Sequence, residues 1–216
     1  MNGIVFITFI KAKKKKVDRW RELQTAVTSI KNRHPKLAVS LYSDEVPSIS
    51  GLDHIKKIEV DSIRMKHKIL YDSPYDNTLY LDCDVKVVGP ILDSFRLMER
   101  FDLAATHDLI RKDPKKSTKY SEYDKIPDGF SEFGGGVFMF RKSPQTKNFF
   151  KVWQEEVDKW YKLTGIMKDQ PGLRVAVWKC SDLKFYVLPP EFNIRSKNYD
   201  NIQPRILHEH NLWRKK

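Results

Sequence analysis

Apolar residues along this chain occur in short clusters that have two different spacings. Residues 4–10 (IVFITFI) form a nearly continuous apolar run, as expected of a strand that is buried on both faces of a sheet. Apolar residues between Trp20 and Ile30 recur at helical spacing, so residues 17–31 are predicted to form an amphipathic helix. The chain therefore opens with a strand that is followed by a helix.

Strands and helices are predicted to alternate along the rest of the chain. Further strands are expected at residues 37–42, 55–60, 78–81, 102–106, 137–141 and 184–188, with 85–88 continuing the strand at 78–81 and 206–207 forming a short apolar segment. Further helices are expected at residues 63–71, 91–100 and 169–178, and after Ser143-Pro144, a pair typical of a helix start. This alternation indicates an α/β fold with a mostly parallel central sheet and helices on both faces. Because ligands bind beyond the carboxyl ends of such strands, functional residues are expected there.

One stretch interrupts this pattern. Residues 108–130 are rich in Lys, Asp, Ser and Pro and contain few apolar positions, so a long mobile loop is predicted there. A length of 216 residues suits a single α/β domain over residues 1–216.

The charge of the chain points to an anionic partner. Lys and Arg outnumber Asp and Glu by 40 to 28, which gives a formal net charge of +12. Such a surface attracts nucleic acid, a phosphorylated small molecule or an anionic membrane, and charge alone does not choose among them. The lysines within residues 11–16 either form a solvated loop or add to this field.

Three further features favour a cytoplasmic protein without a transmembrane segment. The apolar run at the N-terminus precedes its lysines, which is the reverse of a secretory signal. Cys83 and Cys180 lie far apart without the spacing of a metal or redox motif, so free thiols and a reducing compartment are expected. The chain has no run of about 18 apolar residues, the length needed to span a bilayer.

Asp82 and Asp84 are the strongest candidates for chemistry. They directly follow an apolar strand, and on an extended chain residues two apart point to the same side. Paired carboxylates suit Mg²⁺ or Mn²⁺, and such an ion would bridge them to a nucleotide diphosphate. The same spacing occurs elsewhere without an apolar run on both sides, at Glu59/Asp61, Glu122/Asp124 and Glu156/Asp158. Carboxylates that interrupt a buried strand need a partner, so Asp82 and Asp84 are predicted to bind a cation.

The chain resembles a known family at this point. Residues 64–95 (RMKHKILYDSPYDNTLYLDCDVKVVGPILDSF) are similar to the signature of GT-A nucleotide-diphospho-sugar transferases, in which a basic helix and a Ser-Pro-Tyr turn precede a strand with a DxD motif. Three further segments resemble that family in order: 133–143 (FGGGVFMFRKS) its acceptor strand, 169–170 an Asp-Gln pair at the start of a helix, and 206–208 a strand whose histidine joins the metal. The resemblance spans residues 4–213.

The resemblance implies a single GT-A domain that transfers a sugar from a nucleotide-diphosphate donor, with UDP the usual nucleotide, to a hydroxyl of a glycan or glycoprotein. It implies Mn²⁺ or Mg²⁺ as cofactor and no nucleic acid as partner. Residues 1–106 would bind the nucleotide sugar, and residues 107–216 would bind the acceptor and supply the C-terminal metal ligand. Small enzymes of this type occur in bacteria and large viruses, so a virus-encoded protein acting in the host cytoplasm is a further expectation.

The resemblance also assigns the donor and metal residues. The metal ligands would be Asp82, Asp84 and His208, with His210 the rival histidine and a satisfied buried histidine the alternative role for His208. The donor would contact the loop that begins near Thr8, together with Asp44, Arg64, Lys68, Asp82 and the peptide at Cys83. Arg64 and Lys68 are four residues apart on one helical face, and a solvated face is the alternative. For Asp44 the alternative is a surface turn.

The acceptor residues leave the stereochemistry open. Gly135 and Gly136 would let an acceptor sugar approach the backbone, or would form a bulge in a strand. If the enzyme inverts the anomeric centre, Asp169 is the first choice for the catalytic base, with Glu132 and Asp128 behind it. If it retains the configuration, Asp169 and Gln170 would position donor and acceptor. Helix capping is the structural alternative for Asp169.

The sequence argues against three other classes of protein. A sugar nucleotidylyltransferase needs a glycine-rich loop after the first strand, and residues 11–16 contain no glycine. A metal-dependent nucleic-acid-processing enzyme would use the positive charge and the carboxylates, but no helix-turn-helix, zinc or RNA-binding motif is recognisable. A carbohydrate-binding protein without catalysis would have little use for a metal site.

Overall fold

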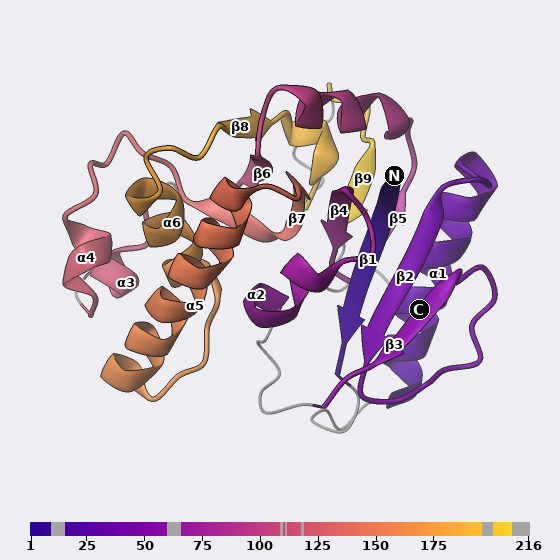
Figure 1. Cartoon of the computed structure of the whole chain (residues 1–216), viewed down its shortest axis with the longest axis horizontal. Helices are drawn as coiled ribbons and strands as arrows, with labels where there is room; N and C mark the ends of the chain where they lie inside the picture. The colour runs from indigo at the N-terminus through magenta and orange to yellow at the C-terminus, as the bar shows by residue number, and fades with distance from the viewer. Residues whose placement is uncertain are drawn as a thin grey trace.

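The computed structural model describes residues 1–9, 16–59, 66–108, 110, 112–117, 119–195 and 201–208. A seven-stranded sheet lies at its centre, with the strand order β3-β2-β1-β4-β7-β6-β8 (Figure 1). The strands are β1 (Asn2–Thr8), β2 (Ala38–Ser43), β3 (His54–Lys57), β4 (Asn77–Leu81), β6 (Leu103–His107), β7 (Phe133–Arg141) and β8 (Phe185–Leu188). β7 is antiparallel to both of its neighbours and the other pairings are parallel, so the predicted mostly parallel sheet is confirmed.

Helices cover both faces of this sheet, as predicted. They are α1 (Lys16–Arg33), α2 (Lys66–Ile69), α3 (Pro114–Ser117), α4 (Ser121–Asp124), α5 (Pro144–Thr164) and α6 (Gln170–Lys179), with 3-10 segments η1 (Leu70–Asp72), η2 (Leu92–Glu99) and η3 (Pro190–Phe192). Side chains alternate along β1: Phe6 packs in the same core as Val27 of α1, whereas Val5 packs with Trp153 of α5. The continuous apolar run of the first strand is explained, because both of its faces are buried.

A second, two-stranded sheet brings the C-terminal region to the middle of the chain. β5 (Val85–Val87) pairs antiparallel with β9 (Ile206–His208), and Val85 is opposite His208. The prediction that residues 85–88 continue the strand at 78–81 is therefore wrong, since the chain turns after Leu81 and enters a different sheet.

The region predicted to be a long loop with few core positions contributes to a small hydrophobic core. Tyr120, Tyr123 and Ile126 are buried together with Trp160 of α5 and Val175 of α6. Two short helices, α3 and α4, lie in this segment, at the far side of the molecule from β1 (Figure 1). The loop prediction was wrong because the apolar residues here are few and stand among charged ones.

The start of α5 follows its sequence signal. Ser143 Oγ accepts a hydrogen bond from the amide of Thr146 at 3.1 Å, and Thr146 Oγ1 accepts one from the amide of Ser143 at 2.9 Å. This reciprocal pair satisfies two amides that the first turn of a helix leaves unpaired. Gly165, at φ +66°, ends the helix.

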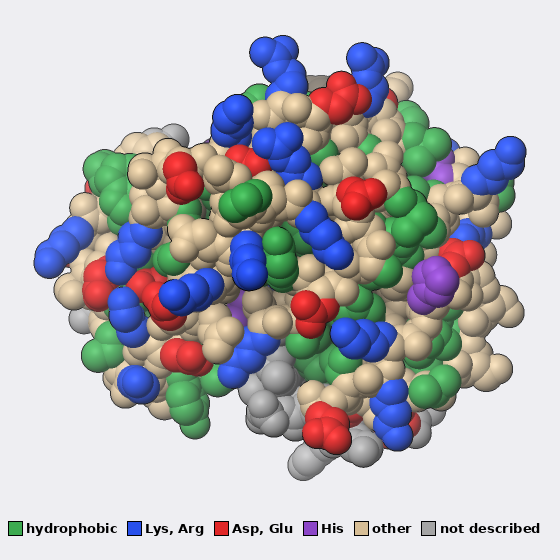
Figure 2. Space-filling view, viewed as in Figure 1, with side chains coloured by type: hydrophobic (Ala, Val, Ile, Leu, Met, Phe, Trp, Pro, Cys, Tyr) green, Lys and Arg blue, Asp and Glu red, His purple; other side chains and the backbone are tan. Residues whose placement is uncertain are grey.

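The charged side chains do not form one continuous patch on the face shown in Figure 2. Lys and Arg are spread across it, with Asp and Glu between them. Among the described residues, no helix combines the length and apolar character that a membrane span requires.

Candidate functional site

Several predicted residues lie at the carboxyl edge of the parallel strands. Thr8 is the last residue of β1 and pairs with Ser43 of β2, after which comes Asp44. Asp82 directly follows β4, the neighbour of β1 on its other side. Thr8 and Asp44 are 5% and 4% exposed, so Asp44 is not in an exposed surface turn. Because parallel strands end at the same edge, these residues belong to one rim of the sheet.

Asp82, Asp84 and His208 converge at this rim. Each of the three offers a ligand atom, and these atoms all lie within 4.8 Å of one another. Nε2 of His208 is 3.3 Å from Oδ1 of Asp84 and 3.9 Å from Oδ2 of Asp82. Two carboxylates and one imidazole form a donor set that fits a divalent cation.

The convergence has a different cause from the predicted one. The chain leaves the extended conformation after Leu81 and turns over residues 83–84, so strand alternation does not align the two aspartates. The antiparallel pairing of Val85 with His208 then carries the imidazole to them.

Gly136 provides the space for this cluster. A Cβ atom added at Gly136 would lie 2.4 Å from Cε1 of His208 and 2.7 Å from Oδ2 of Asp82. The amide of Asp82 donates to the carbonyl of Gly136 at 2.8 Å, so β7 also holds the backbone of the site. Glycine is required here because two side chains of the protein itself approach the strand closely.

Further contacts orient the aspartate and the histidine. The Tyr80 hydroxyl donates to Oδ1 of Asp82 at 2.6 Å, and burial, with Asp82 as a second cause, raises the pKa of Tyr80 well above its usual value. Nδ1 of His208 lies 2.8 Å from Oδ1 of Asn193. A histidine that ligates a metal through one ring nitrogen typically has such a partner on the other.

Cys83 has its side chain in the core. Its Sγ donates to the carbonyl of Ile7 at 3.6 Å, and burial raises the pKa of the thiol. Any contact between Cys83 and a nucleotide would therefore involve its backbone. Both Cys83 and Cys180 are free thiols, as predicted.

Lys66 is a central residue of the site that the sequence reasoning missed. It is 8% exposed, and its Nζ donates to the carbonyl of Gly135, pairs with Oδ2 of Asp169 at 2.8 Å and lies 3.8 Å from Oδ1 of Asp82. The same ammonium is over the ring of Tyr80, 5.1 Å from its centroid. The Lys66 ammonium thus links three parts of the site: the cluster of Asp82, Asp84 and His208, the strand β7, and Asp169.

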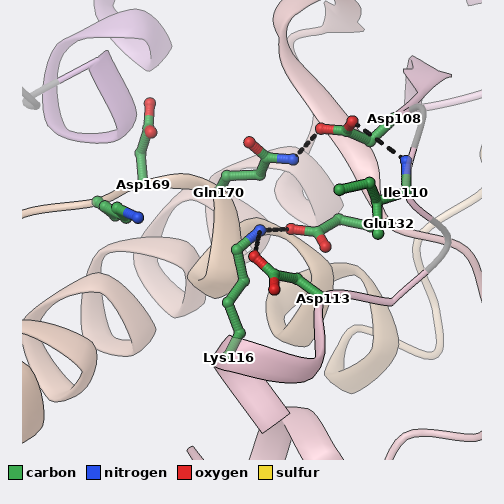
Figure 3. Close-up of a pocket in the computed structure, with 8 residues that line it drawn as sticks. Asp108, Ile110, Asp113, Lys116, Glu132, Asp169 and Gln170 are labelled. Carbon is green, nitrogen blue, oxygen red and sulfur yellow. Dashed lines mark hydrogen bonds and ion pairs between the residues drawn. The ribbon is translucent and has the colours of Figure 1, made fainter. Parts of the chain in front are cut away.

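Asp169 and Gln170 line a pocket next to this cluster (Figure 3). Its volume is about 280 Å³, and its lining is almost entirely polar: Asp108, Ile110, Asp113, Lys116, Glu132, Lys168, Asp169 and Gln170. Nε2 of Gln170 donates to Oδ2 of Asp108. Asp169 precedes α6 but makes no capping hydrogen bond with its side chain, so the capping alternative is wrong.

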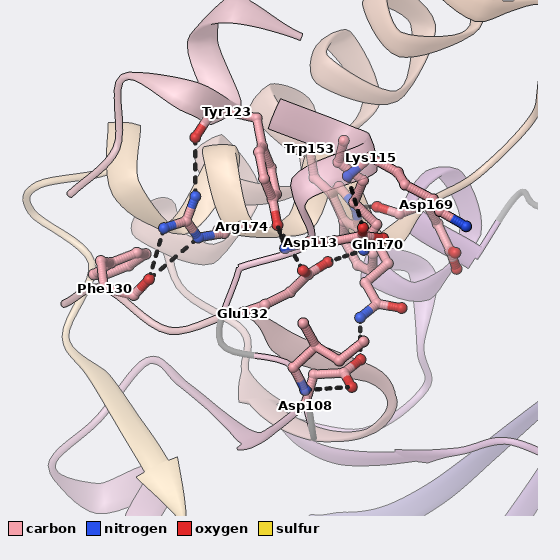
Figure 4. Close-up of polar contacts among 12 residues, drawn as sticks. Asp108, Asp113, Lys115, Tyr123, Phe130, Glu132, Trp153, Asp169, Gln170 and Arg174 are labelled. Carbon is pink, nitrogen blue, oxygen red and sulfur yellow. Dashed lines mark hydrogen bonds and ion pairs between the residues drawn. The ribbon is translucent and has the colours of Figure 1, made fainter. Parts of the chain in front are cut away.

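The two other candidate bases differ from Asp169 in their surroundings. Glu132 is 1% exposed and accepts from Lys116 and, at 2.7 Å, from the hydroxyl of Tyr123 (Figure 4). Burial raises the pKa of Glu132, and Lys116 opposes that shift. Asp128 has an 83% exposed side chain and pairs with Lys112 at 2.9 Å. Both carboxylates are engaged with lysines of the α3 region.

The structure does not bring every predicted residue into the site. Lys68 is exposed on α2, and none of the described contacts joins it to the metal cluster. Arg64, His210 and the lysines at 11 and 13–15 lie outside the described residues. Gly135 and Gly136 lie within β7, and the space above them is occupied by Lys66, Asp82 and His208.

Comparison with known proteins was made at three levels. The family model for nucleotide-diphospho-sugar transferases matches residues 76–208, which is more than half of the chain. A search of curated proteins returned no match. Many solved structures match.

Three of these structures show the range of similarity. The galactosyltransferase LgtC, solved with donor and acceptor sugar analogues, superposes with a TM-score of 0.64 at 18% identity, over 98% of this chain and 88% of that one. The glycosyltransferase GlyE of Streptococcus pneumoniae TIGR4 gives 0.65 at 18% identity, over 96% and 55%. Mouse xyloside xylosyltransferase 1 in its apo form gives 0.67 at 12% identity, over 98% of both chains. At these identities the likeness establishes the fold, and the predicted GT-A architecture is confirmed.

The family match selects one of the classes that the sequence left open. The matched segment includes β4, β7 and β9 together with Asp82, Asp84 and Asp169, which form part of the rim and of the pocket. The chain belongs to the nucleotide-diphospho-sugar transferase family.

Proposed function

We propose that this protein transfers a sugar from a nucleotide-diphosphate donor, a UDP-sugar, to a hydroxyl of a glycan or glycoprotein. The observation that carries the proposal is the cluster of Asp82, Asp84 and His208 at the rim of the sheet, beside a polar pocket. A cation site and a sugar-sized pocket that share one edge are what a metal-dependent glycosyl transfer requires.

The donor would lie along the rim formed by residues 1–106. Thr8 ends β1 and Asp44 directly follows the neighbouring strand β2, which supports contacts with the nucleoside. Asp82 and the backbone at Cys83 would complete the donor site. Lys66 is better placed for the sugar or diphosphate than Lys68, because it is the lysine that faces Asp82. Arg64 remains a candidate from sequence alone.

Mn²⁺ or Mg²⁺ would be held by Asp82, Asp84 and His208, where it would offset negative charge on the leaving diphosphate. The imidazole in the donor set favours Mn²⁺, since Mg²⁺ prefers ligands that are all oxygen. Hydrogen bonds from Tyr80 to Asp82 and between Asn193 and His208 would hold two of these ligands in place.

The acceptor would occupy the pocket in the half formed by residues 107–216. Gln170 and Asp169 line it. Gly135 and Gly136 remain acceptor candidates from sequence alone, because side chains of the protein occupy the space above them. Asp169 is the proposed catalytic residue. Its ion pair with Lys66 favours a positioning role over that of a base, because the ammonium engages one of its two oxygens. NMR assignment of the anomeric configuration of the product distinguishes these roles.

The buried free thiols Cys83 and Cys180 support a reducing compartment, and we place the activity in the cytoplasm, which for a virus-encoded enzyme is that of the host.

Thermal denaturation with a panel of sugar nucleotides, each with and without Mn²⁺, tests the proposal. The matching nucleotide should raise the melting temperature only when metal is present, since ligands stabilise the state that binds them. Asp84→Ala should abolish this dependence and reduce transfer of sugar, measured as release of UDP, by at least about 100-fold.

Asp124→Ala is a matched control from another acid-x-acid pair. Asp124 lies on α4 and pairs with Lys112 at 3.3 Å. This variant should keep both the metal dependence and the activity. An Asp84→Ala protein that responds to nucleotide and Mn²⁺ like the parent would refute the assignment of the site.

A further inference from the structure

Asn193 connects the histidine of the metal cluster to the central sheet. Its Oδ1 is 2.8 Å from Nδ1 of His208, and its Nδ2 donates to Oγ1 of Thr106 in β6 at 3.0 Å. Asn193 is 9% exposed and Thr106 is 1% exposed, so these contacts are shielded from water. A Cβ added at Gly134 would lie 3.1 Å from the Thr106 hydroxyl and 3.2 Å from Nδ2 of Asn193. The first of the three glycines thus makes room for this pair.

Backbone hydrogen bonds fix Asn193 relative to His208. The amide of Asn193 donates to the carbonyl of Pro190 at 3.0 Å, which closes η3. The next residue, Ile194, accepts from the amide of His208 at 2.9 Å and donates to the carbonyl of Ile206 at 3.0 Å. The side chain of Asn193 is therefore held against the imidazole by the same segment that anchors β9.

The chemistry of the amide sets the proton on the imidazole. A carboxamide oxygen only accepts hydrogen bonds and its nitrogen only donates them. With Nδ2 donating to Thr106, the oxygen faces His208, and Nδ1 must carry a proton to bond to it. Neutral His208 then has its lone pair on Nε2, the atom that faces Asp84 and Asp82 at 3.3 and 3.9 Å.

We propose that Asn193 is a positioning residue that holds His208 in the tautomer able to bind a divalent cation through Nε2, while Thr106 accepts a hydrogen bond from the amide nitrogen of Asn193. The inference rests on the metal site of the proposed function. Partners of this kind behind a ligating histidine typically change metal affinity by about 10- to 100-fold when they are removed.

Binding of Mn²⁺ to the protein without nucleotide, followed by electron paramagnetic resonance, gives the first test. Asn193→Ala should weaken Mn²⁺ binding by about 10- to 100-fold. Asn193→Asp keeps an acceptor for Nδ1–H and should restore affinity to within about threefold of the parent. Thr106→Val should cost less than Asn193→Ala, because it loosens the amide without removing the acceptor.

The tautomer itself is measured by nitrogen NMR of histidine-labelled, metal-free protein, with His208→Gln to assign the signals. At a pH where His208 is neutral, the parent should carry its proton on Nδ1. In Asn193→Ala the two neutral tautomers should mix. Melting temperatures of all variants show whether they are folded, and Asn193→Asp serves as the variant that changes the side chain least.

Two results would overturn the inference. One is a parent spectrum with the proton of neutral His208 on Nε2; the other is Asn193→Ala binding Mn²⁺ as tightly as the parent while His208→Ala does not. Failure of the proposed function is a different outcome, since a parent that binds Mn²⁺ but transfers no sugar would leave Asn193 in its role. If the parent bound no Mn²⁺, the NMR measurement would still decide the tautomer.

Discussion

The two halves of the candidate site are built in different ways. On the proposed donor side, apolar strands such as β1 and β4 end at one rim. Thr8 is the last residue of β1, and Asp44 and Asp82 directly follow β2 and β4. On the acceptor side, the pocket is walled by the segment around α3 and α4, whose own core is small. Sheet pairing thus places the proposed donor residues, whereas side-chain contacts must place the proposed acceptor residues.

Arg174 fixes the segment that walls the proposed acceptor pocket to α6. It is fully buried on α6, and its guanidinium donates to the carbonyls of Tyr123 at 2.9 Å, Pro127 at 3.1 Å and Phe130 at 2.7 Å (Figure 4). One side chain therefore satisfies three backbone groups of the segment that walls the pocket. The proposed donor rim thus depends on close approach of backbone and side chains, whereas the wall of the proposed acceptor pocket depends on a few buried charged groups.

The largest effect is expected from Gly136→Ala, which tests the donor rim. The added methyl would lie 2.4 Å from His208 and 2.7 Å from Asp82, so at least one ligand must move. A misplacement of about 1 Å at a reacting centre costs about 100-fold in rate, and we expect at least that loss in sugar transfer, together with loss of Mn²⁺ binding.

Gly129→Ala is the matched control, because a Cβ at Gly129 meets nothing within 4 Å. Activity and metal binding should be unchanged in it. If Gly136→Ala retained parental Mn²⁺ affinity, the rim would tolerate movement and the contrast between the two halves would be lost.

Arg174→Leu should act on the acceptor side alone. Removing the guanidinium takes the donor from the carbonyls of Tyr123, Pro127 and Phe130, of which Tyr123 is buried, and we expect this to cost about 3 kcal/mol of the free energy of unfolding. Hydrogen exchange should become faster in residues 119–132, and the KM for acceptor should rise. Stabilisation by donor nucleotide and Mn²⁺ should persist, measured by thermal denaturation.

Arg96→Leu provides the control, since Arg96 is exposed on η2. It should change neither hydrogen exchange in the pocket wall nor KM. Equal loss of donor and acceptor binding in Arg174→Leu would show that the halves are not independent.

Residues that follow a local strand pattern could be predicted from sequence, whereas residues placed by contacts far along the chain could not. Asp82 and Asp84 interrupt an apolar run, and that local pattern alone marks them as needing a cation. His208 has no local signal, since its place depends on the pairing of β5 with β9, and only the resemblance to the family pointed to it.

Lys66 and the pocket wall were misjudged for one physical reason. Arg64 and Lys68 are predicted from their spacing of four on one helical face, and residues 108–130 are predicted to form a loop because polar segments are usually solvated. Neither pattern points to Lys66. In the structure, charged residues are buried because they pair with others far along the chain: Lys66 with Asp169, and Glu156 with Lys179 at 2.9 Å. Pairing over such distances leaves no periodic trace in the sequence.

His67 lies where α2 packs against α5, at the contact between residues 1–106 and residues 107–216. Its substitution is expected to have the smallest effect on stability. His67 is 2% exposed, and its ring is 5.8 Å from that of Trp153 on α5. Neither ring nitrogen has a hydrogen-bond partner among the described residues. Burial lowers its pKa to about 4, from 6.5 in the unfolded chain.

The sign of the pH effect follows from that shift. Between pH 6.5 and 4 the unfolded chain takes up a proton at His67 and the folded protein does not, so this contribution to stability is present above pH 6.5 and is lost as the pH falls through that window. At pH 5 the loss of stability from this group should be about 2 kcal/mol.

His67→Leu, which fills a similar volume without a titratable group, tests this expectation. Its free energy of unfolding, measured with urea, should fall by correspondingly less between pH 7 and pH 5. His54→Gln, on the exposed strand β3, should keep the parental loss. A His67→Leu protein that lost as much stability as the parent would mean that the folded protein tolerates a charged His67 imidazole. In that case α2 and α5 would be less tightly packed than the ring contact indicates.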